Sequence, residues 1–297
     1  MNQKLYIVFV LAFLSVHAFG QRININKALR YFQQEKLDSA KIFIDEASQH
    51  PETSSFSETW YYKGFVYKEI YNKNKGRNDE SDTRDVAINS FFKHLELDTT
   101  GRFQQSAEKS IKYLATTIYN DAVVQLNTVD YGKAIANFEK YKGIMEQIEP
   151  STNLLEIELQ FNSVLAGVYN QIYEEDNEKN HNFLDKCAET YQRVISLDPN
   201  NISANYNLGI LYYNEAVNII KNLDYDLDII TLELVQDDIV VLFKKALPYM
   251  EKAYQLNPKK EDTLTGLSGI YFSLNEFEKQ ERIEKELELL KKSGQDE

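Results

Sequence analysis

Apolar and small side chains recur at intervals of three and four along most of this 297-residue chain. One clear segment covers residues 206–213, and another places Ala246, Met250 and Ala253 four and then three residues apart. Such spacing gathers apolar side chains on one face of an α-helix, because the helix completes a turn in about 3.6 residues. The chain holds only 11 Gly and 5 Pro, the residue types that most often interrupt helices. The pattern therefore predicts an all-α fold with long helices.

The predicted helices recur in pairs of similar sequence. Residues 208–212 read Leu-Gly-x-x-Tyr and follow Pro199, while residues 246–258 place two alanines seven apart and end in Pro258. Counting on from Pro258 with the spacing that separates Pro199 from Leu208 and Tyr212 reaches Leu267 and Tyr271. These segments resemble the tetratricopeptide repeat (TPR), a unit of about 34 residues that forms two antiparallel helices. The resemblance implies a right-handed α-solenoid of about six hairpins between residues 21 and 292.

Small residues occupy matching places in the paired helices. Two helices that pack about 8 to 10 Å apart need small side chains where their backbones come closest. The first, second, fourth and fifth pairs supply them as Ala28 with Ala40, Gly64 with Ala87, Ala166 with Cys187, and Gly209 with Ala246. We expect these residues to be buried at the helix crossings.

Three of the pairs are longer than the repeat they resemble. The small residues are 12 apart in the first pair, but 23 apart from Gly64 to Ala87, 21 from Ala166 to Cys187 and 37 from Gly209 to Ala246. The additional residues fall within 68–86, 170–183 and 214–243, and the sequence leaves open whether they extend the helices or form loops.

The two ends of the chain differ from the repeats. Residues 1–20 combine Lys4, an apolar run to Phe13 and the small residues Ala18 and Gly20, which predicts a secretory signal peptide cleaved after Gly20. A membrane anchor is the alternative, but Ser15 and His17 interrupt the run before it reaches the roughly 20 residues needed to cross a bilayer. We therefore expect an exported protein, periplasmic or extracellular, without a membrane anchor after cleavage. Residues 293–297 are expected to form a short tail.

Charge and cysteine content narrow the classes of partner. The net charge of −13 repels phosphate backbones, so nucleic acid is not an expected partner. With Cys187 as its single cysteine, the chain cannot form an internal disulfide. The acidic segments 79–82 and 224–228 lack the Gly and Glu that a calcium-binding EF-hand loop requires, and a turn with a helix-capping Asp is the preferred interpretation.

The sequence offers little for catalysis. It contains no glycine-rich phosphate loop, no Gly-x-Ser-x-Gly and no His-Glu-x-x-His motif. His181, Asp185 and Cys187 lie close in sequence and could form a metal or nucleophile site, but Cys187 stands where the repeat requires a small buried residue. We expect no enzyme activity, no cofactor and no metal.

The TPR resemblance implies that partners bind to a concave face lined by the first helix of each pair. By spacing, the exposed side of those helices is expected to carry Tyr61, Phe65, Tyr119, Asn170, Tyr206, Tyr213, Asn214 and Phe272. The alternative is that several of these aromatic residues only fill the grooves between repeats. The chain lacks the basic groove residues with which the family clamps a terminal carboxylate. The sequence therefore predicts a non-catalytic scaffold of the cell envelope that binds a protein or peptide, with a small-ligand or oligosaccharide module as the alternative.

Overall fold

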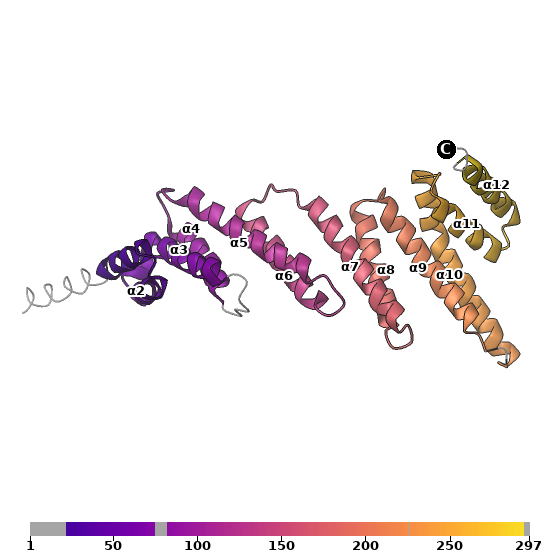
Figure 1. Ribbon diagram of the computed structural model, residues 1–297, viewed down its shortest axis with the longest axis horizontal. Helices are drawn as coiled ribbons and strands as arrows, with labels where there is room; N and C mark the ends of the chain where they lie inside the picture. Colours follow the sequence, from indigo (N-terminus) through magenta and orange to yellow (C-terminus); the bar gives the residue numbers. More distant parts are fainter. Residues whose placement is uncertain (1–21, 75–81, 225, 294–297) are drawn as a thin grey trace, which may run out of the picture. The chain divides into compact units, whose positions relative to one another are not determined.

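The computed structural model describes residues 22–74, 82–224 and 226–293 (Figure 1). Every regular element in these ranges is a helix, which confirms the all-α prediction. The expected signal peptide at residues 1–20 lies outside the described residues, as do 79–81 of the first acidic segment and 294–297 of the expected tail.

The chain divides into two compact units, of which the first comprises Met1–Ala122 and Ile135–Thr152. Its elements are a helix at residues 22–33, α2 (Leu37–Gln49), the 3-10 turn η1 (Thr53–Ser55), α3 (Ser57–Asn74), α4 (Thr83–Leu97), and most of α5 (Gln104–Val124) and α6 (Tyr131–Ile148). Stacked rings of Tyr31 and Phe43 join residues 22–33 to α2. Tyr119 joins α5 to Phe138 and Tyr141 of α6.

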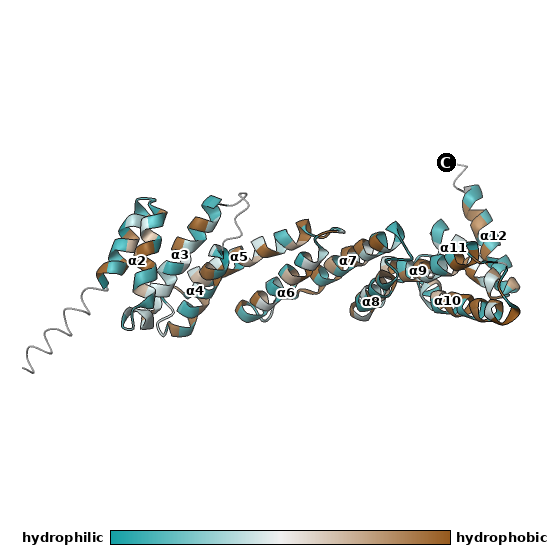
Figure 2. Cartoon of the chain, turned by 90° about the horizontal axis from the view of Figure 1, so that it is seen from below, coloured by the Kyte–Doolittle hydropathy of each residue, from teal (hydrophilic) through white to brown (hydrophobic). Residues whose placement is uncertain are grey.

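The second unit comprises Val123–Ala134 and Asn153–Glu297. Its helices are α7 (Leu155–Glu175), α8 (Asn182–Leu197), α9 (Ile202–Lys221), α10 (Ile229–Leu256), α11 (Glu261–Ser273) and α12 (Phe277–Ser293). They pack as the pairs α7 with α8, α9 with α10 and α11 with α12 (Figure 1). Hydrophobic and hydrophilic residues alternate along each helix, as amphipathic packing requires (Figure 2).

The helix crossings use the small residues that the sequence predicts. All eight are buried, and Cys187 donates a hydrogen bond from its Sγ to the carbonyl oxygen of Ala166 over 3.3 Å. A Cβ atom added to Gly209 would lie 3.2 Å from the backbone nitrogen of Met250 on α10. A Cβ at Gly64 would lie 2.7 Å from the ring of Phe91 on α4. The absence of a side chain at these glycines lets the paired helices approach closely.

Most of the additional residues in the long pairs extend helices. In the fourth pair α7 continues to Glu175 and α8 starts at Asn182, so only residues 176–181 connect them. In the fifth pair residues 222–228 connect α9 to α10, and α10 extends over 28 residues. Asp228 caps α10, because its Oδ1 accepts a hydrogen bond from the backbone nitrogen of Thr231 over 3.0 Å. This confirms the preferred interpretation of the second acidic segment as a turn with a capping Asp.

No helix in the described ranges has both the length and the apolar composition needed to cross a bilayer.

Candidate functional site

An open cavity of about 250 Å³ lies in the second unit between α7 and α9, the first helices of two consecutive pairs, and is called here the interhelix groove. It is lined by Asn170, Tyr173, Glu174, Asn177, Leu211, Asn214, Val217, Asn218 and Lys221. Asn170 donates a hydrogen bond from Nδ2 to Oε1 of Glu174 over 2.8 Å. Two of the predicted partner-binding residues, Asn170 and Asn214, are therefore brought to one cavity from different repeats.

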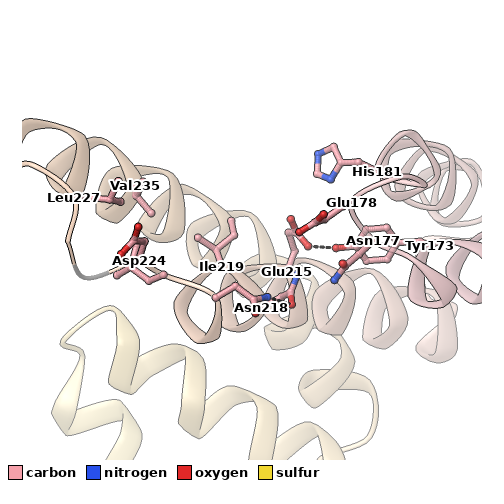
Figure 3. Close-up of a pocket in the computed structure, with 12 residues that line it drawn as sticks. Tyr173, Asn177, Glu178, His181, Glu215, Asn218, Ile219, Asp224, Leu227 and Val235 are labelled. Carbon is pink, nitrogen blue, oxygen red and sulfur yellow. Dashed lines mark hydrogen bonds between the residues drawn. The ribbon is translucent and has the colours of Figure 1, made fainter.

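A second cavity of about 440 Å³ adjoins the interhelix groove and shares Tyr173, Asn177 and Asn218 with it. We call it the Glu215 cavity. Its further lining residues come from the connection 176–181, from the C-terminal half of α9, from the connection 222–228 and from α10; they are Glu178, His181, Glu215, Ile219, Asn222, Leu223, Asp224, Leu227 and Val235. Figure 3 shows Glu178 and Asn177 beside Tyr173 and Glu215, and Leu227 and Val235 at the opposite end.

The Tyr173 hydroxyl donates a hydrogen bond to Oε2 of Glu215 (Figure 3). Both residues are buried, with 7% of Tyr173 and 6% of Glu215 exposed. Burial, and then the adjacent carboxylate, raise the pKa of Tyr173 well above its ordinary value, so the hydroxyl remains a donor. Among the described residues no basic side chain forms an ion pair with Glu215.

The connection between α7 and α8 is held by its own hydrogen bonds. Asn180 donates from Nδ2 to the carbonyl oxygen of Ile172 over 2.7 Å, which ties the connection back to α7. The Oδ1 of Asp176 accepts a hydrogen bond from the backbone nitrogen of Lys179 over 3.2 Å. This wall of the Glu215 cavity is therefore formed before any ligand binds.

Three predicted groove residues of the first unit take part in packing between helices. Tyr61 stacks on Phe103 at 4.3 Å between ring centroids, and its hydroxyl donates to Oγ of Ser106 over 3.0 Å. The ring of Phe65 meets Phe91 edge to face at 5.2 Å. Tyr119 lies 5.1 Å from Tyr141. Tyr61 thus contacts the next helix pair, as the alternative interpretation expects, whereas Phe65 and Tyr119 pack against the second helix of their own pairs.

The remaining predicted residues lie elsewhere in the second unit. Tyr206 lies under the ammonium group of Lys260, 3.9 Å from its ring centroid. Tyr213 packs against Phe243, and a Cβ at Gly269 would come within 2.7 Å of its hydroxyl. Phe272 is 59% exposed and lies 6.3 Å from Phe277. None of these three lines the two cavities, so their role in binding stays a prediction.

Sequence reasoning missed Tyr173 and Glu215. Glu215 directly precedes the apolar stretch that starts at Ala216, and neither residue belongs to a known motif. The available signal was an acidic residue on the inward face of an otherwise apolar helix.

The proposed grouping of His181 with Cys187 does not form a reactive site. His181 is exposed at the Glu215 cavity, whereas Cys187 is fully buried between α7 and α8. Burial raises the pKa of the Cys187 thiol to about 12, so it is not a thiolate at neutral pH. Within residues 22–74, 82–224 and 226–293, no three His, Cys, Asp or Glu side chains converge as metal ligands.

Residues 184–215, from α8 into α9, match the family model described as TPR repeat. The resemblance is therefore confirmed for this segment. No curated protein matches the chain.

Several solved structures are similar in fold. One is a MamA double mutant (RS-1), at a TM-score of 0.34 and 13% identity, covering 79% of this chain and 98% of that one. Another is YrrB, described as a TPR protein with an unusual peptide-binding site. Its TM-score is 0.25 and its sequence identity 18%, and the match covers 82% of this chain and 89% of YrrB. A third is the human IFIT1 dimer with m7Gppp-AAAA, at a TM-score of 0.36 and 14% sequence identity, covering 88% of this chain and 58% of the IFIT1 chain. This chain thus spans little more than half of IFIT1.

Proposed function

We propose that this protein is a non-catalytic scaffold that binds an extended segment of a partner polypeptide in the interhelix groove. The observation that carries the proposal is the position of Asn170 and Asn214 at one cavity, from the first helices of consecutive repeats. The matched TPR segment includes Asn214, and stacked TPR helices typically form extended binding surfaces.

The groove has the chemistry that a peptide backbone requires. Asparagine side chains both donate and accept hydrogen bonds, as the peptide unit does. Leu211 and Val217 add apolar surface to the groove. Since α7 and α9 are packed helices, their backbone does not have to be ordered when a partner binds, which limits the loss of conformational entropy.

We further propose that the scaffold acts outside the cytoplasm, in the periplasm or at the cell exterior. Residues 1–20 support this through their signal-peptide pattern. The acidic net charge of −13 supports a polypeptide partner over nucleic acid.

A small-ligand function is the second candidate, because the Glu215 cavity of about 440 Å³ falls in the size range of small-molecule pockets, roughly 300 to 1,000 Å³. The oligosaccharide version has less support, since Tyr206 and Tyr213 do not line this cavity. A small ligand would raise the melting temperature without any polypeptide present.

Affinity capture from extracts of the source cell tests the proposal. The bait is the chain from residue 21, compared with Asn214→Trp, which fills the groove from an exposed position. The matched control is Glu189→Trp, exposed on α8 and outside both cavities. A partner retained by the control and lost with Asn214→Trp supports the groove, whereas retention by both variants contradicts it.

A further inference from the structure

We infer that the Glu215 cavity receives a basic side chain, lysine or arginine, from the polypeptide bound in the interhelix groove. The inference rests on the proposed function and adds the chemistry of one anchor residue of the partner. Two observations support the inference: the Glu215 cavity adjoins the interhelix groove, and the buried carboxylate of Glu215 lines that cavity.

Within the described residues, the Glu215 carboxylate in the cavity has no positively charged side chain as its partner. Glu215 is 6% exposed, and its Oε2 accepts a hydrogen bond from the neutral hydroxyl of Tyr173, which carries no positive charge. A carboxylate removed from water is costly unless a cation pairs with it. Glu178 adds a second carboxylate on the same side of the cavity as Glu215, whereas Asp224 lies at the opposite end beside Leu227 and Val235 (Figure 3). A cationic group that reaches Glu215 would therefore gain from Glu178 as well.

The two basic residues nearest to the cavity do not pair with Glu215. His181 lines the cavity from its exposed edge, and Lys221 lines the adjoining groove. Neither forms an ion pair with Glu215 in the described structure.

The shape of the cavity suits a long side chain with a charged end. Ile219 lines the cavity next to Glu215, and Leu227 and Val235 line its far end (Figure 3). Lysine and arginine bury their aliphatic stems against apolar surface while the charged group reaches a polar site. The Tyr173 ring adds an aromatic surface that attracts cations.

Other occupants fit less well. An acidic side chain or a terminal carboxylate would be repelled by Glu178, Glu215 and Asp224. An apolar side chain would displace water and leave the Glu215 charge buried without a cation, which is unfavourable.

Selection from a displayed library of random peptides tests the inference while the natural partner is unidentified. The whole chain from residue 21 is the target, and binders that also bind Asn214→Trp are removed, so that the remaining peptides depend on the groove. These peptides are then measured against wild type, Glu215→Gln, Tyr173→Phe and the exposed control Glu189→Gln. Each peptide is also made with its basic residue replaced by norleucine.

We expect a lysine or arginine at one fixed position of the selected peptides. Glu215→Gln should weaken these peptides roughly tenfold or more, as loss of a buried charge partner does, and should leave the norleucine versions unchanged. Glu189→Gln should have little effect. If Glu215→Gln does not melt like wild type, Glu178→Gln carries the test, because its side chain is exposed and lies on the same side of the cavity as Glu215 (Figure 3).

Two results would overturn the inference in different ways. Groove-dependent peptides without a fixed basic residue, or with affinity unchanged by Glu215→Gln, would exclude the basic anchor and leave the proposed function standing. Failure to obtain any groove-dependent peptide would contradict both.

Discussion

The Sγ atom of Cys187 lies 3.3 Å from the carbonyl oxygen of Ala166, where α8 crosses α7. Both residues are fully buried. The contact shows how the single cysteine of the chain is used: it is a small core residue at a helix crossing, and α7 is thereby held in the position from which it lines the interhelix groove.

We predict that Cys187 resists thiol reagents in the native state. Its pKa is raised to about 12 by burial, and no path from solvent reaches a side chain that is fully buried. Reaction with Ellman's reagent should be slow at neutral pH and should reach one thiol per chain in denaturant. Rapid labelling of the folded protein would show that the crossing of α7 and α8 is open.

Replacing Gly209 by Leu should lower the free energy of unfolding by about 1 to 3 kcal/mol through overpacking. The obstacle is the backbone of α10 at Ala246 and Met250, which cannot rotate away as a side chain can. The matched control is Gly167→Leu, where an added Cβ meets no described atom within 4 Å. The control should be neutral or stabilising by about 0.5 to 1 kcal/mol, because leucine favours helix more than glycine does. Equal urea midpoints for the two variants would contradict this packing.

Asp98 should make stability depend on pH in acid. Its carboxylate accepts hydrogen bonds from the side chain and the backbone nitrogen of Thr100, and these lower its pKa. A lowered pKa means that the folded state favours the carboxylate. The stabilisation is therefore complete above the unfolded value of about 3.9 and disappears as pH falls through the lower folded value.

The variant Asp98→Asn tests this dependence. Its melting temperature should be below that of wild type by a constant amount from neutral pH down to about pH 5, and the difference should shrink below about pH 4. Asp237→Asn, exposed on α10, is the control and should show no such dependence. A difference that persists at the lowest pH would assign the effect of Asp98→Asn to something other than the charge.

Tyr67→Phe should reduce stability by about 0.5 to 1.5 kcal/mol. The hydroxyl donates to both carboxylate oxygens of Asp45, at 2.9 and 2.7 Å, and burial together with this carboxylate raises the pKa of Tyr67 to about 12. The control is Tyr113→Phe, which removes a hydroxyl bonded to Asn72 at an exposed position. Thermal melts of the two variants should differ, and an equal loss in both would contradict a special role for the buried contact.

The sequence revealed the helix crossings better than it revealed the site. Ala28, Ala40, Ala87 and Cys187 were identifiable because a close helix contact admits few residue types. Tyr61 and Phe65 were harder to place, since an aromatic side chain at helical spacing can pack against a neighbouring helix as well as line an exposed wall. The pairing of Tyr173 with Glu215 depends on how two repeats stack, and neither repeat alone contains that information.

The most direct test of partner binding between α7 and α9 is photo-crosslinking from the groove inside the source cell. A photoreactive amino acid replaces Asn214, and a control chain carries it at Glu189 on α8. We expect the probe at position 214 to crosslink one discrete polypeptide that the probe at position 189 does not. The crosslinked segment of that polypeptide should contain a lysine or arginine near the point of crosslinking. The same crosslinks from both positions, or none from position 214 in cells where the protein is functional, would contradict binding in the interhelix groove.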